Sequence, residues 1–219
     1  MKIMAELEVS RPILEANQRL AQENRRRFQE AGVKVLNLIS SPGAGKTSVL
    51  EQTLARTRDR LQVAVVEGDI QTTEDAQRVA ACGVKAVQIE TRGACHLDGA
   101  MLARTLEAFD LPSLDLLIVE NVGNLVCPVE FDLGEDMKVA VLSVTEGDDK
   151  PAKYPQLFQE AGVLLVNKID LLPHVDCDIE RIHQTSRRLN PDQVIFDISC
   201  RTGQGLEQWV DWLVEWVKA

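Results

Sequence analysis

The sequence predicts an α/β fold in which a mostly parallel sheet of seven strands is covered by helices on both faces. Seven short apolar runs alternate with amphipathic segments of helix length, and this alternation is typical of parallel strands joined by crossover helices. The runs are continuously apolar, which indicates strands that are buried on both sides. With 219 residues, of which 45% are hydrophobic, the chain is long enough to build such a core.

The residues ahead of the first strand predict a helix over 10–31, because apolar side chains recur there at helical spacing and Gly32 can end the helix. The run Arg25-Arg26-Arg27 lies in this helix, and we interpret it as a solvated charged face rather than an anion-binding site. We assign residues 1–32 to an N-terminal helical extension and residues 33–219 to one domain.

The seven predicted strands are 33–39, 62–66, 84–89, 114–119, 139–144, 163–166 and 194–198. The last predicted helix, 205–218, carries Trp209, Trp212 and Trp216 on one face, because residues three and four apart are neighbours on a helix. Such an aromatic stripe is typical of core packing, an interpretation that we prefer to partner docking.

The charge balance limits the partners of the chain. It has 24 Lys and Arg against 34 Asp and Glu, a net charge of −10, whereas general nucleic-acid binders rely on clustered basic residues. No apolar run approaches the roughly 18 residues of a membrane span, and Glu6 and Glu8 lie where a signal peptide is apolar. We therefore expect a cytoplasmic protein that binds neither nucleic acid nor membrane.

A glycine-rich loop directly follows the first predicted strand. Residues 40–47 read Ser-Ser-Pro-Gly-Ala-Gly-Lys-Thr and precede a helix expected to begin near Ser48. This is the context of the phosphate-binding loop of P-loop NTPases, although Ser40 replaces the first glycine. The glycines let backbone N–H groups converge on an anion, while Lys46 is expected to neutralise the β and γ phosphates and Thr47 to bind Mg²⁺. The predicted phosphate-binding residues are Gly43, Ala44, Gly45, Lys46, Thr47 and Ser48.

The segment Asn167-Lys168-Ile169-Asp170 follows the predicted strand 163–166 and indicates a preference for guanine. The Asp170 carboxylate can accept both N–H groups on the Watson–Crick edge of guanine, an arrangement that adenine does not offer. Asn167 is expected to reach the opposite edge of the base, and the stem of Lys168 to cover its ring. The segment Ser199-Cys200-Arg201 follows the next strand and is expected to support the base through backbone amides.

Two acidic residues at the ends of interior strands, Asp69 and Glu120, are candidate Mg²⁺ ligands beside Thr47. The segment 120–123 lies where GTPases usually have Asp-x-x-Gly, so we expect it to act as a switch with the Gly123 amide near the γ phosphate. Asp75 can either position the attacking water or cap a helix. The candidate catalytic residues are Lys46, Asp75 and Glu120. The sequence shows no convincing arginine finger, which predicts slow intrinsic hydrolysis.

Cysteine and histidine residues form a third candidate site. The five cysteines are an odd number in a chain that needs no disulfides, so we expect thiols or metal ligands. Cys95, His96 and Cys127 offer two thiols and an imidazole, a set suited to Zn²⁺ or Ni²⁺ rather than Mg²⁺. Buried thiols and an ordinary loop histidine are the alternative interpretation. Three ligands leave a tetrahedral site one short, and water or a second copy of the chain can supply the fourth.

Five segments together carry a resemblance to a known family: residues 40–47, 68–72, 95–98, 120–128 and 167–170. They resemble the HypB family, the GTPases that assist nickel insertion into NiFe hydrogenase, and the resemblance spans nearly the whole chain. It implies a homodimer assembled or tightened by GTP, with an interface metal site made by Cys95, His96 and Cys127. It also implies a HypA-like nickel metallochaperone as partner and the hydrogenase large subunit as client. Residues 147–153 are implied to approach the nucleotide, with Lys153 as the candidate contact.

The nearest alternative is another GTPase of similar build, such as a UreG-like chaperone or the chaperone of methylmalonyl-CoA mutase. UreG-like chains place Cys, Pro and His in one short Cys-Pro-His segment, which this sequence lacks. Two further alternatives belong to other classes of protein. One is a small-molecule kinase, against which the segment 167–170 argues, and the other is a metal buffer whose metal affinity does not depend on nucleotide. The ligand set itself suits zinc and nickel equally.

Overall fold

The computed structural model describes residues 11–69, 74–91 and 93–219. The strands are β1 Lys34–Ser40, β2 Val63–Asp69, β3 Lys85–Glu90, β4 Leu116–Glu120, β5 Met137–Ser143, β6 Val163–Asn167 and β7 Val194–Asp197. The helices are α1 Arg11–Ala31, α2 Lys46–Thr57, α3 Glu74–Ala81, α4 Gly99–Thr105, α5 Cys127–Glu130, α6 Lys150–Lys153, α7 Pro155–Glu160, α8 Ile179–Leu189 and α9 Leu206–Lys218.

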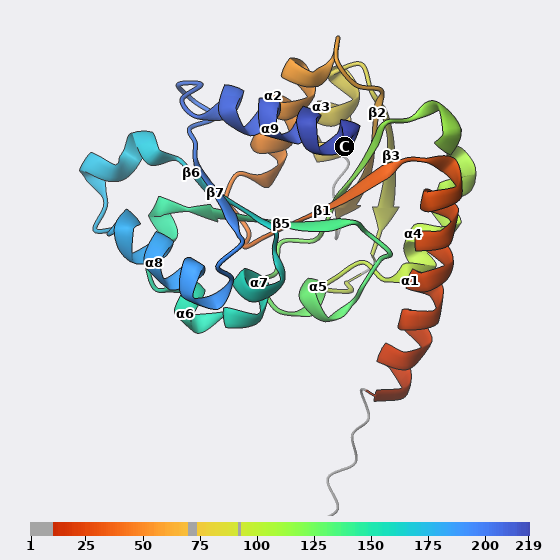
Figure 1. Cartoon of the computed structure of the whole chain (residues 1–219), viewed down its shortest axis with the longest axis horizontal. Coiled ribbons are helices and arrows are strands. Elements are labelled where there is room, and N and C mark those ends of the chain that lie inside the picture. The colour runs from red at the N-terminus through yellow and green to blue at the C-terminus, as the bar shows by residue number, and fades with distance from the viewer. Residues whose placement is uncertain (1–10, 70–73, 92) are drawn as a thin grey trace, which may run out of the picture.

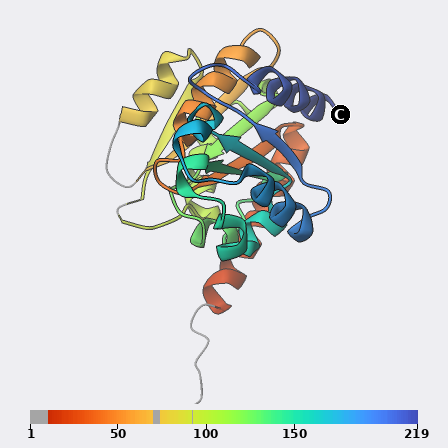
Figure 2. The ribbon, with the colours of Figure 1, turned by 90° about the vertical axis from the view of Figure 1, so that its left-hand side faces the viewer.

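All seven strands pair in parallel in one sheet, in the order β3-β2-β4-β1-β5-β6-β7. Helices α2, α3 and α9 cover one face, and α1, α4, α5, α7 and α8 lie on the other (Figure 1). Figure 2 shows the same two layers of helices from the side. The predicted α/β architecture is therefore confirmed.

Each predicted apolar run became a strand whose ends differ from the prediction by at most three residues. The largest difference is in β2, which continues past Val66 because Glu67, Gly68 and Asp69 pair with β3. Backbone pairing with a neighbouring strand extends this element beyond its apolar stretch. The helix after the phosphate loop begins at Lys46 rather than near Ser48, so Lys46 is part of its first turn.

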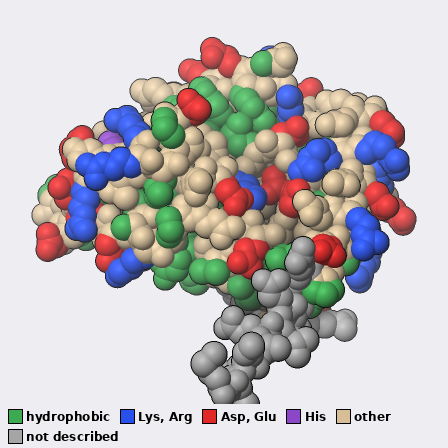
Figure 3. Space-filling model, turned by 60° about the horizontal axis from the view of Figure 1, so that its bottom comes forward, with side chains coloured by type: hydrophobic (Ala, Val, Ile, Leu, Met, Phe, Trp, Pro, Cys, Tyr) green, Lys and Arg blue, Asp and Glu red, His purple; other side chains and the backbone are tan. Residues whose placement is uncertain are grey.

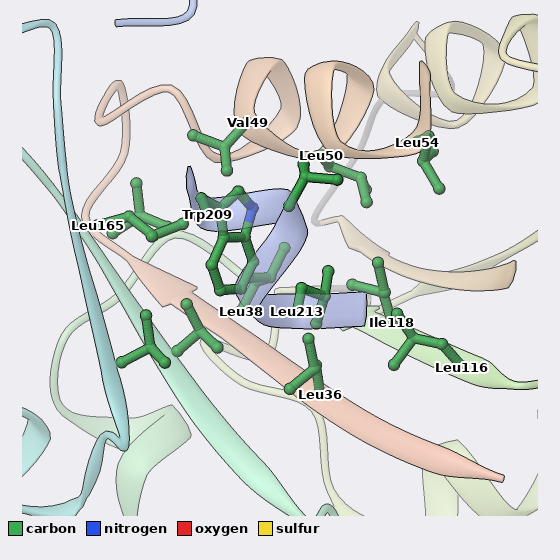
Figure 4. Close-up of a cluster of buried hydrophobic side chains, with 14 of the residues drawn as sticks. Leu36, Leu38, Val49, Leu50, Leu54, Leu116, Ile118, Leu165, Trp209 and Leu213 are labelled. Atoms are coloured by element: carbon green, nitrogen blue, oxygen red, sulfur yellow. The ribbon is translucent and has the colours of Figure 1, made fainter. Parts of the chain in front are cut away.

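The largest cluster of buried apolar side chains lies between the sheet and helices α2 and α9 (Figure 4). Trp209 is 1% exposed there, and its indole Nε1 donates a hydrogen bond to Thr53 Oγ1 (2.9 Å). Trp212 stacks on both Trp209 and Trp216, with ring centroids 5.9 and 6.4 Å apart. The three tryptophans pack against the core, as the sequence predicted.

Helix α1 packs against α4 on the other face of the sheet. Asn24 of α1 is buried, and its Nδ2 donates to the carbonyls of Gly99 (3.0 Å) and Leu133 (3.1 Å). The interpretation of the arginine run as a solvated face is wrong for Arg25, whose Nη2 lies 2.9 Å from both carboxylate oxygens of Asp132. The partner of Arg25 lies 107 residues away in the sequence, so local patterning could not reveal it.

The described surface is mixed in character. On the face shown in Figure 3, acidic and basic side chains are interspersed with apolar ones. Among the described residues, Ile13 and Val126 are large apolar side chains that stand exposed, at 58% and 49%. Within the same part of the chain, no helix has both the length and the apolar character needed to cross a membrane.

The strand order places the candidate site. Strand β1 lies between β4 and β5, and in an open parallel sheet ligands bind beyond the carboxyl ends of the strands where connections diverge to the two faces. The segments that follow β1, β4 and β6 therefore meet at one edge of the sheet. These are the three segments in which the sequence predicted phosphate, magnesium and base contacts.

Candidate functional site

The loop between β1 and α2 forms the first wall of the site. Gly43 and Gly45 have φ angles of 79° and 95°, in the left-handed region that side chains with a Cβ disfavour. A Cβ on Gly45 would lie 2.6 Å from Nδ2 of Asn167. Asn167 Nδ2 donates to the Ala44 carbonyl (3.0 Å), and Lys168 Nζ to that of Gly43 (2.6 Å). The predicted phosphate loop and the predicted guanine segment are thus in direct contact.

Lys46 and Thr47 begin α2 and both bond to Glu120 at the end of β4. The Oε1 atom of Glu120 lies 2.6 Å from Lys46 Nζ and accepts a hydrogen bond from Thr47 Oγ1 (2.8 Å). Glu120 is 0% exposed, and its Oε2 has no hydrogen-bond partner among the described residues. A buried, unpartnered carboxylate oxygen beside a threonine hydroxyl offers the hard oxygen ligands that suit Mg²⁺.

A cavity of about 340 Å³ opens beside the phosphate loop, large enough for a small ligand. It is lined by Gly45, Ser48, Glu51, Gln52, Asn167, Lys168, Asp170, Leu171, Cys200 and Arg201. A larger cavity of about 590 Å³ between α1 and α7 includes none of the predicted site residues in its lining. The chemistry therefore favours the smaller cavity, because it alone of the two contains the guanine segment.

The loop after β7 closes the smaller cavity and is bonded to the guanine segment. Ser199 Oγ donates to Asp170 Oδ1 (2.6 Å), and the backbone N–H of Cys200 donates to Asn167 Oδ1 (3.4 Å). Burial raises the pKa of the Cys200 thiol to about 11, so this thiol stays neutral at neutral pH. Ser199 bonds only the Oδ1 atom of Asp170. The carboxylate of Asp170 also lines the cavity, where it can accept hydrogen bonds from the edge of a base.

The cysteine and histidine residues predicted as metal ligands come together. The donor atoms of Cys95, His96 and Cys127 all lie within 4.8 Å of one another. Cys95 and His96 lie in the loop between β3 and α4, whereas Cys127 begins α5. Phe131 stacks on the His96 ring at a centroid distance of 3.7 Å. Asn124 Nδ2 donates to the Cys95 carbonyl (3.2 Å) and so joins the two ligand-bearing segments.

The protonation states suit a transition metal. A hydrogen bond with Cys127, and then burial, raise the pKa of the Cys95 thiol. Burial lowers the pKa of His96 against the opposing influence of Asp98 and Glu130. The imidazole is therefore neutral and available as a ligand at neutral pH, while the thiols bind a cation by releasing protons. All five cysteines are free thiols, as expected.

This arrangement was compared with known proteins. Residues 34–197 match the sequence profile of the family "CobW/HypB/UreG, nucleotide-binding domain". The hydrogenase maturation factor HypB of Escherichia coli (strain K12) is 50% identical over 207 residues, covering 94% of this chain and 71% of that protein. The chain belongs to the HypB family.

Solved HypB structures share the fold. The crystal structure of HypB from Helicobacter pylori in complex with nickel matches with a TM-score of 0.88 and 39% identity, over 93% of this chain and 95% of that one. HypB from Archaeoglobus fulgidus matches with a TM-score of 0.87 and 38% identity, over 93% and 99% of the two chains. The resemblance inferred from the five segments and the predicted P-loop NTPase fold are both confirmed.

The predicted switch segment of this HypB-family chain contacts the phosphate loop. A Cβ on Gly123 would lie 3.1 Å from the backbone of Pro42, so the two segments are packed tightly. Gly123 is thus held against the phosphate loop, and a contact of its amide with a phosphate stays a prediction. Asp69 ends β2 and Asp75 lies in α3, but their side chains lie outside the described part of the structure.

Lys153 is a predicted site residue whose ion pair lies next to its own short helix. It ends α6, its side chain is 61% exposed, and its Nζ pairs with Asp149 Oδ2 (2.5 Å). It does not line the cavity beside the phosphate loop. A role for Lys153 in the HypB site of a second copy is therefore a proposal.

Sequence reasoning missed two buried polar residues beside the site. Glu67 of β2 is 1% exposed and lies in register with Glu120 of β4, so the two carboxylates share one face of the sheet. Asn121 is 0% exposed and follows Glu120 directly. The available signal was weak in both cases, namely a polar residue inside or just after an apolar run.

Proposed function

We propose that this chain is a GTP-hydrolysing metallochaperone for nickel insertion during NiFe hydrogenase maturation. One observation carries the proposal: Cys127 lies just beyond the strand end where Glu120 bonds both Lys46 and Thr47. A nucleotide that takes Lys46 and Thr47 from Glu120 is therefore expected to disturb the segment that carries a metal ligand. The solved complex of a HypB relative with nickel supports nickel as the cargo, and zinc is the alternative ion for the same ligands.

Guanine is the proposed base. Asp170 and Asn167 both line the cavity beside the phosphate loop, and the half-buried carboxylate of Asp170 would accept two N–H groups of guanine. An adenine nucleotide offers that carboxylate no such pair of donors, and a polar group that a ligand covers without pairing it is costly. Lys168 would cover the ring, with Ser199, Cys200 and Arg201 supporting the base from the loop after β7.

Hydrolysis would use the charged residues at the ends of α2 and β4. Lys46 would neutralise phosphate charge, while Thr47 and Glu120, with Asp69, would hold Mg²⁺ directly or through water. Asp75 is the proposed residue for positioning the attacking water. Because the sequence shows no convincing arginine finger, we expect slow turnover without an activator.

A second copy of the chain is the proposed source of further contacts. Three ligands leave a tetrahedral site one short, and Cys95 is exposed beside the exposed Val126. We propose that GTP assembles or tightens a homodimer across this surface, with Lys153 reaching the nucleotide of the partner. We propose that residues 1–32 form a helical extension and residues 33–219 the GTPase domain. A HypA-like metallochaperone is the proposed partner, and a hydrogenase large subunit in the cytoplasm is the proposed client.

The test measures bound nickel and molecular mass in each nucleotide state. Purified protein is loaded with GDP or a non-hydrolysable GTP analogue and Mg²⁺. Its nickel affinity is measured by titration with nickel chloride against a chelator, and its molecular mass is measured by light scattering. We expect different nickel affinities in the two states and a larger mass with the GTP analogue. Equal affinities and equal masses would contradict the proposal.

Two cysteine variants sharpen this test. Cys127→Ala should abolish nickel binding and retain GDP binding, because only the metal ligand is removed. Cys177→Ala is the matched control, since Cys177 is also a half-buried free thiol but lies outside the cluster of Cys95, His96 and Cys127. It should retain both activities. Loss of nickel and GDP binding together in Cys127→Ala would mean that this cysteine is mainly structural.

A further inference from the structure

Strand β4 leads into two consecutive polar residues that face opposite sides of the sheet. Glu120 lies on the side of α2, where it bonds Lys46 and Thr47. Asn121 continues the strand pairing, because its backbone N–H donates to the Leu38 carbonyl (3.0 Å). Neighbouring residues of an extended chain point to opposite faces, so the Asn121 side chain lies on the side of α1 and α4. It is fully buried there.

The amide oxygen of Asn121 holds the loop that carries two predicted metal ligands. It accepts hydrogen bonds from the backbone N–H groups of Leu97 (3.1 Å) and Val122 (2.9 Å). Leu97 directly follows His96, so this bond fixes the backbone next to that ligand. The Leu97 side chain is 0% exposed and packs so closely on β2 that a Cβ on Gly68 would lie 2.8 Å from its Cδ1.

The amide nitrogen of Asn121 starts a second path, toward the segment of Cys127. It donates to Asn37 Oδ1 (3.2 Å), and Asn37 Nδ2 donates to Glu135 Oε1 (3.2 Å). The other oxygen of Glu135 accepts from the Leu133 N–H (2.7 Å), close after the helix that Cys127 begins. All four residues in this path are buried. A buried group that loses its partner bears the full desolvation penalty, so these segments are expected to move together.

We infer that Asn121 is a positioning residue that couples the nucleotide state to the geometry of Cys95, His96 and Cys127. The inference rests on the proposed function, because it assigns the route between its two sites. When Lys46 and Thr47 turn to phosphate and Mg²⁺, Glu120 exchanges both partners for Mg²⁺ or its waters, and the end of β4 shifts. Asn121 shares that backbone and carries the displacement to Leu97 on one side and to Asn37 on the other. The two nucleotide states then differ in nickel affinity, as coupling requires.

The matched control for Asn121 is Asn24. Both are buried asparagines, and Asn24 also bonds the two ligand-bearing regions, at Gly99 and Leu133. However, Asn24 belongs to α1 and lies far in the sequence from Glu120. Truncating it disturbs the same regions without cutting the proposed route.

The experiment compares nickel affinity with GDP and with a non-hydrolysable GTP analogue in the wild type, Asn121→Ala and Asn24→Ala, using nickel chloride as the probe. Coupled sites typically change each other's affinity about 5- to 150-fold. We expect a wild-type ratio in that range, a ratio close to one in Asn121→Ala, and a wild-type ratio in Asn24→Ala. A ratio that survives intact in Asn121→Ala overturns the inference alone. A wild-type ratio of one overturns the coupling in the proposed function as well.

A second measurement needs no variant and guards against misfolding of Asn121→Ala. Hydrogen exchange of the Leu97 amide reports directly on its bond to Asn121 Oδ1. We expect the protection of this amide to differ between the GDP and GTP-analogue states of the wild-type protein. Equal protection in the two states, alongside different nickel affinities, would place the coupling elsewhere and overturn the inference.

Discussion

At the scale of single residues, the site depends on a glycine that brings two loops into contact. Gly45 combines a φ of 95° with a Cβ position only 2.6 Å from Nδ2 of Asn167. Gly43 has a similar φ of 79°, but a Cβ there would meet nothing within 4 Å. Substitutions at Gly43 and Gly45 therefore differ in one respect. Both strain the backbone, but only a side chain at Gly45 collides with the guanine segment.

We expect Gly45→Ala to weaken GDP binding at least about tenfold more than Gly43→Ala does, a difference of about 1.4 kcal/mol. Both variants force alanine into a left-handed conformation, which costs roughly 1–2 kcal/mol, but only the former pushes Asn167 away from the Ala44 carbonyl. Titration with a fluorescent GDP analogue measures both affinities. Equal losses would show that the contact with Asn167 does not matter for binding.

At the scale of elements, α1 is bonded to both segments that carry the predicted metal ligands. Asn17 Oδ1 accepts from the Gly99 N–H (2.7 Å), and its Nδ2 donates to the Asp132 carbonyl (2.8 Å). Asn24 repeats this bridge on the same face of the helix, two turns along, at Gly99 and Leu133. The helix thus ties the start of α4 to the loop after α5.

Asn24→Ala should lower the free energy of unfolding by about 1–3 kcal/mol, because two buried carbonyls lose their donor. Gln18→Ala on the exposed side of α1 should change it by less than about 0.5 kcal/mol. Urea unfolding followed by circular dichroism measures both. If the two variants were equally stable, the buried bridge would contribute nothing to the docking of α1.

The sequence predicted whole elements better than it predicted contacts between them. Apolar runs sufficed for seven strands, and the order of loop residues indicated two segments, 40–47 and 167–170, that the structure brings into contact. The extension of β2 to Asp69 depends on pairing with β3, and the ion pair of Arg25 depends on a distant aspartate. Asn121 was missed because its role arises from three backbone and side-chain partners that only the fold assembles.

At the scale of the whole molecule, the described residues of one chain offer three predicted metal ligands and an exposed valine beside them. If a second copy completes the site, nickel affinity depends on how much dimer is present, by mass action. We therefore expect apparent nickel affinity in the GTP-analogue state to rise with protein concentration across the dimer dissociation range. Titrations at several dilutions, with light scattering on the same samples, measure this. An affinity independent of concentration would assign the fourth position to water.

The ion pair between Lys46 and Glu120 neutralises the one cation of the proposed phosphate loop with a buried carboxylate. A triphosphate that arrives without a cation must draw Lys46 away from Glu120. The buried Glu120 carboxylate is then unpaired, and its negative charge repels the phosphate oxygens. A triphosphate that arrives with Mg²⁺ brings a replacement counter-ion for the glutamate in the same step. Entry of nucleotide and entry of its cation are thereby expected to occur as a single exchange.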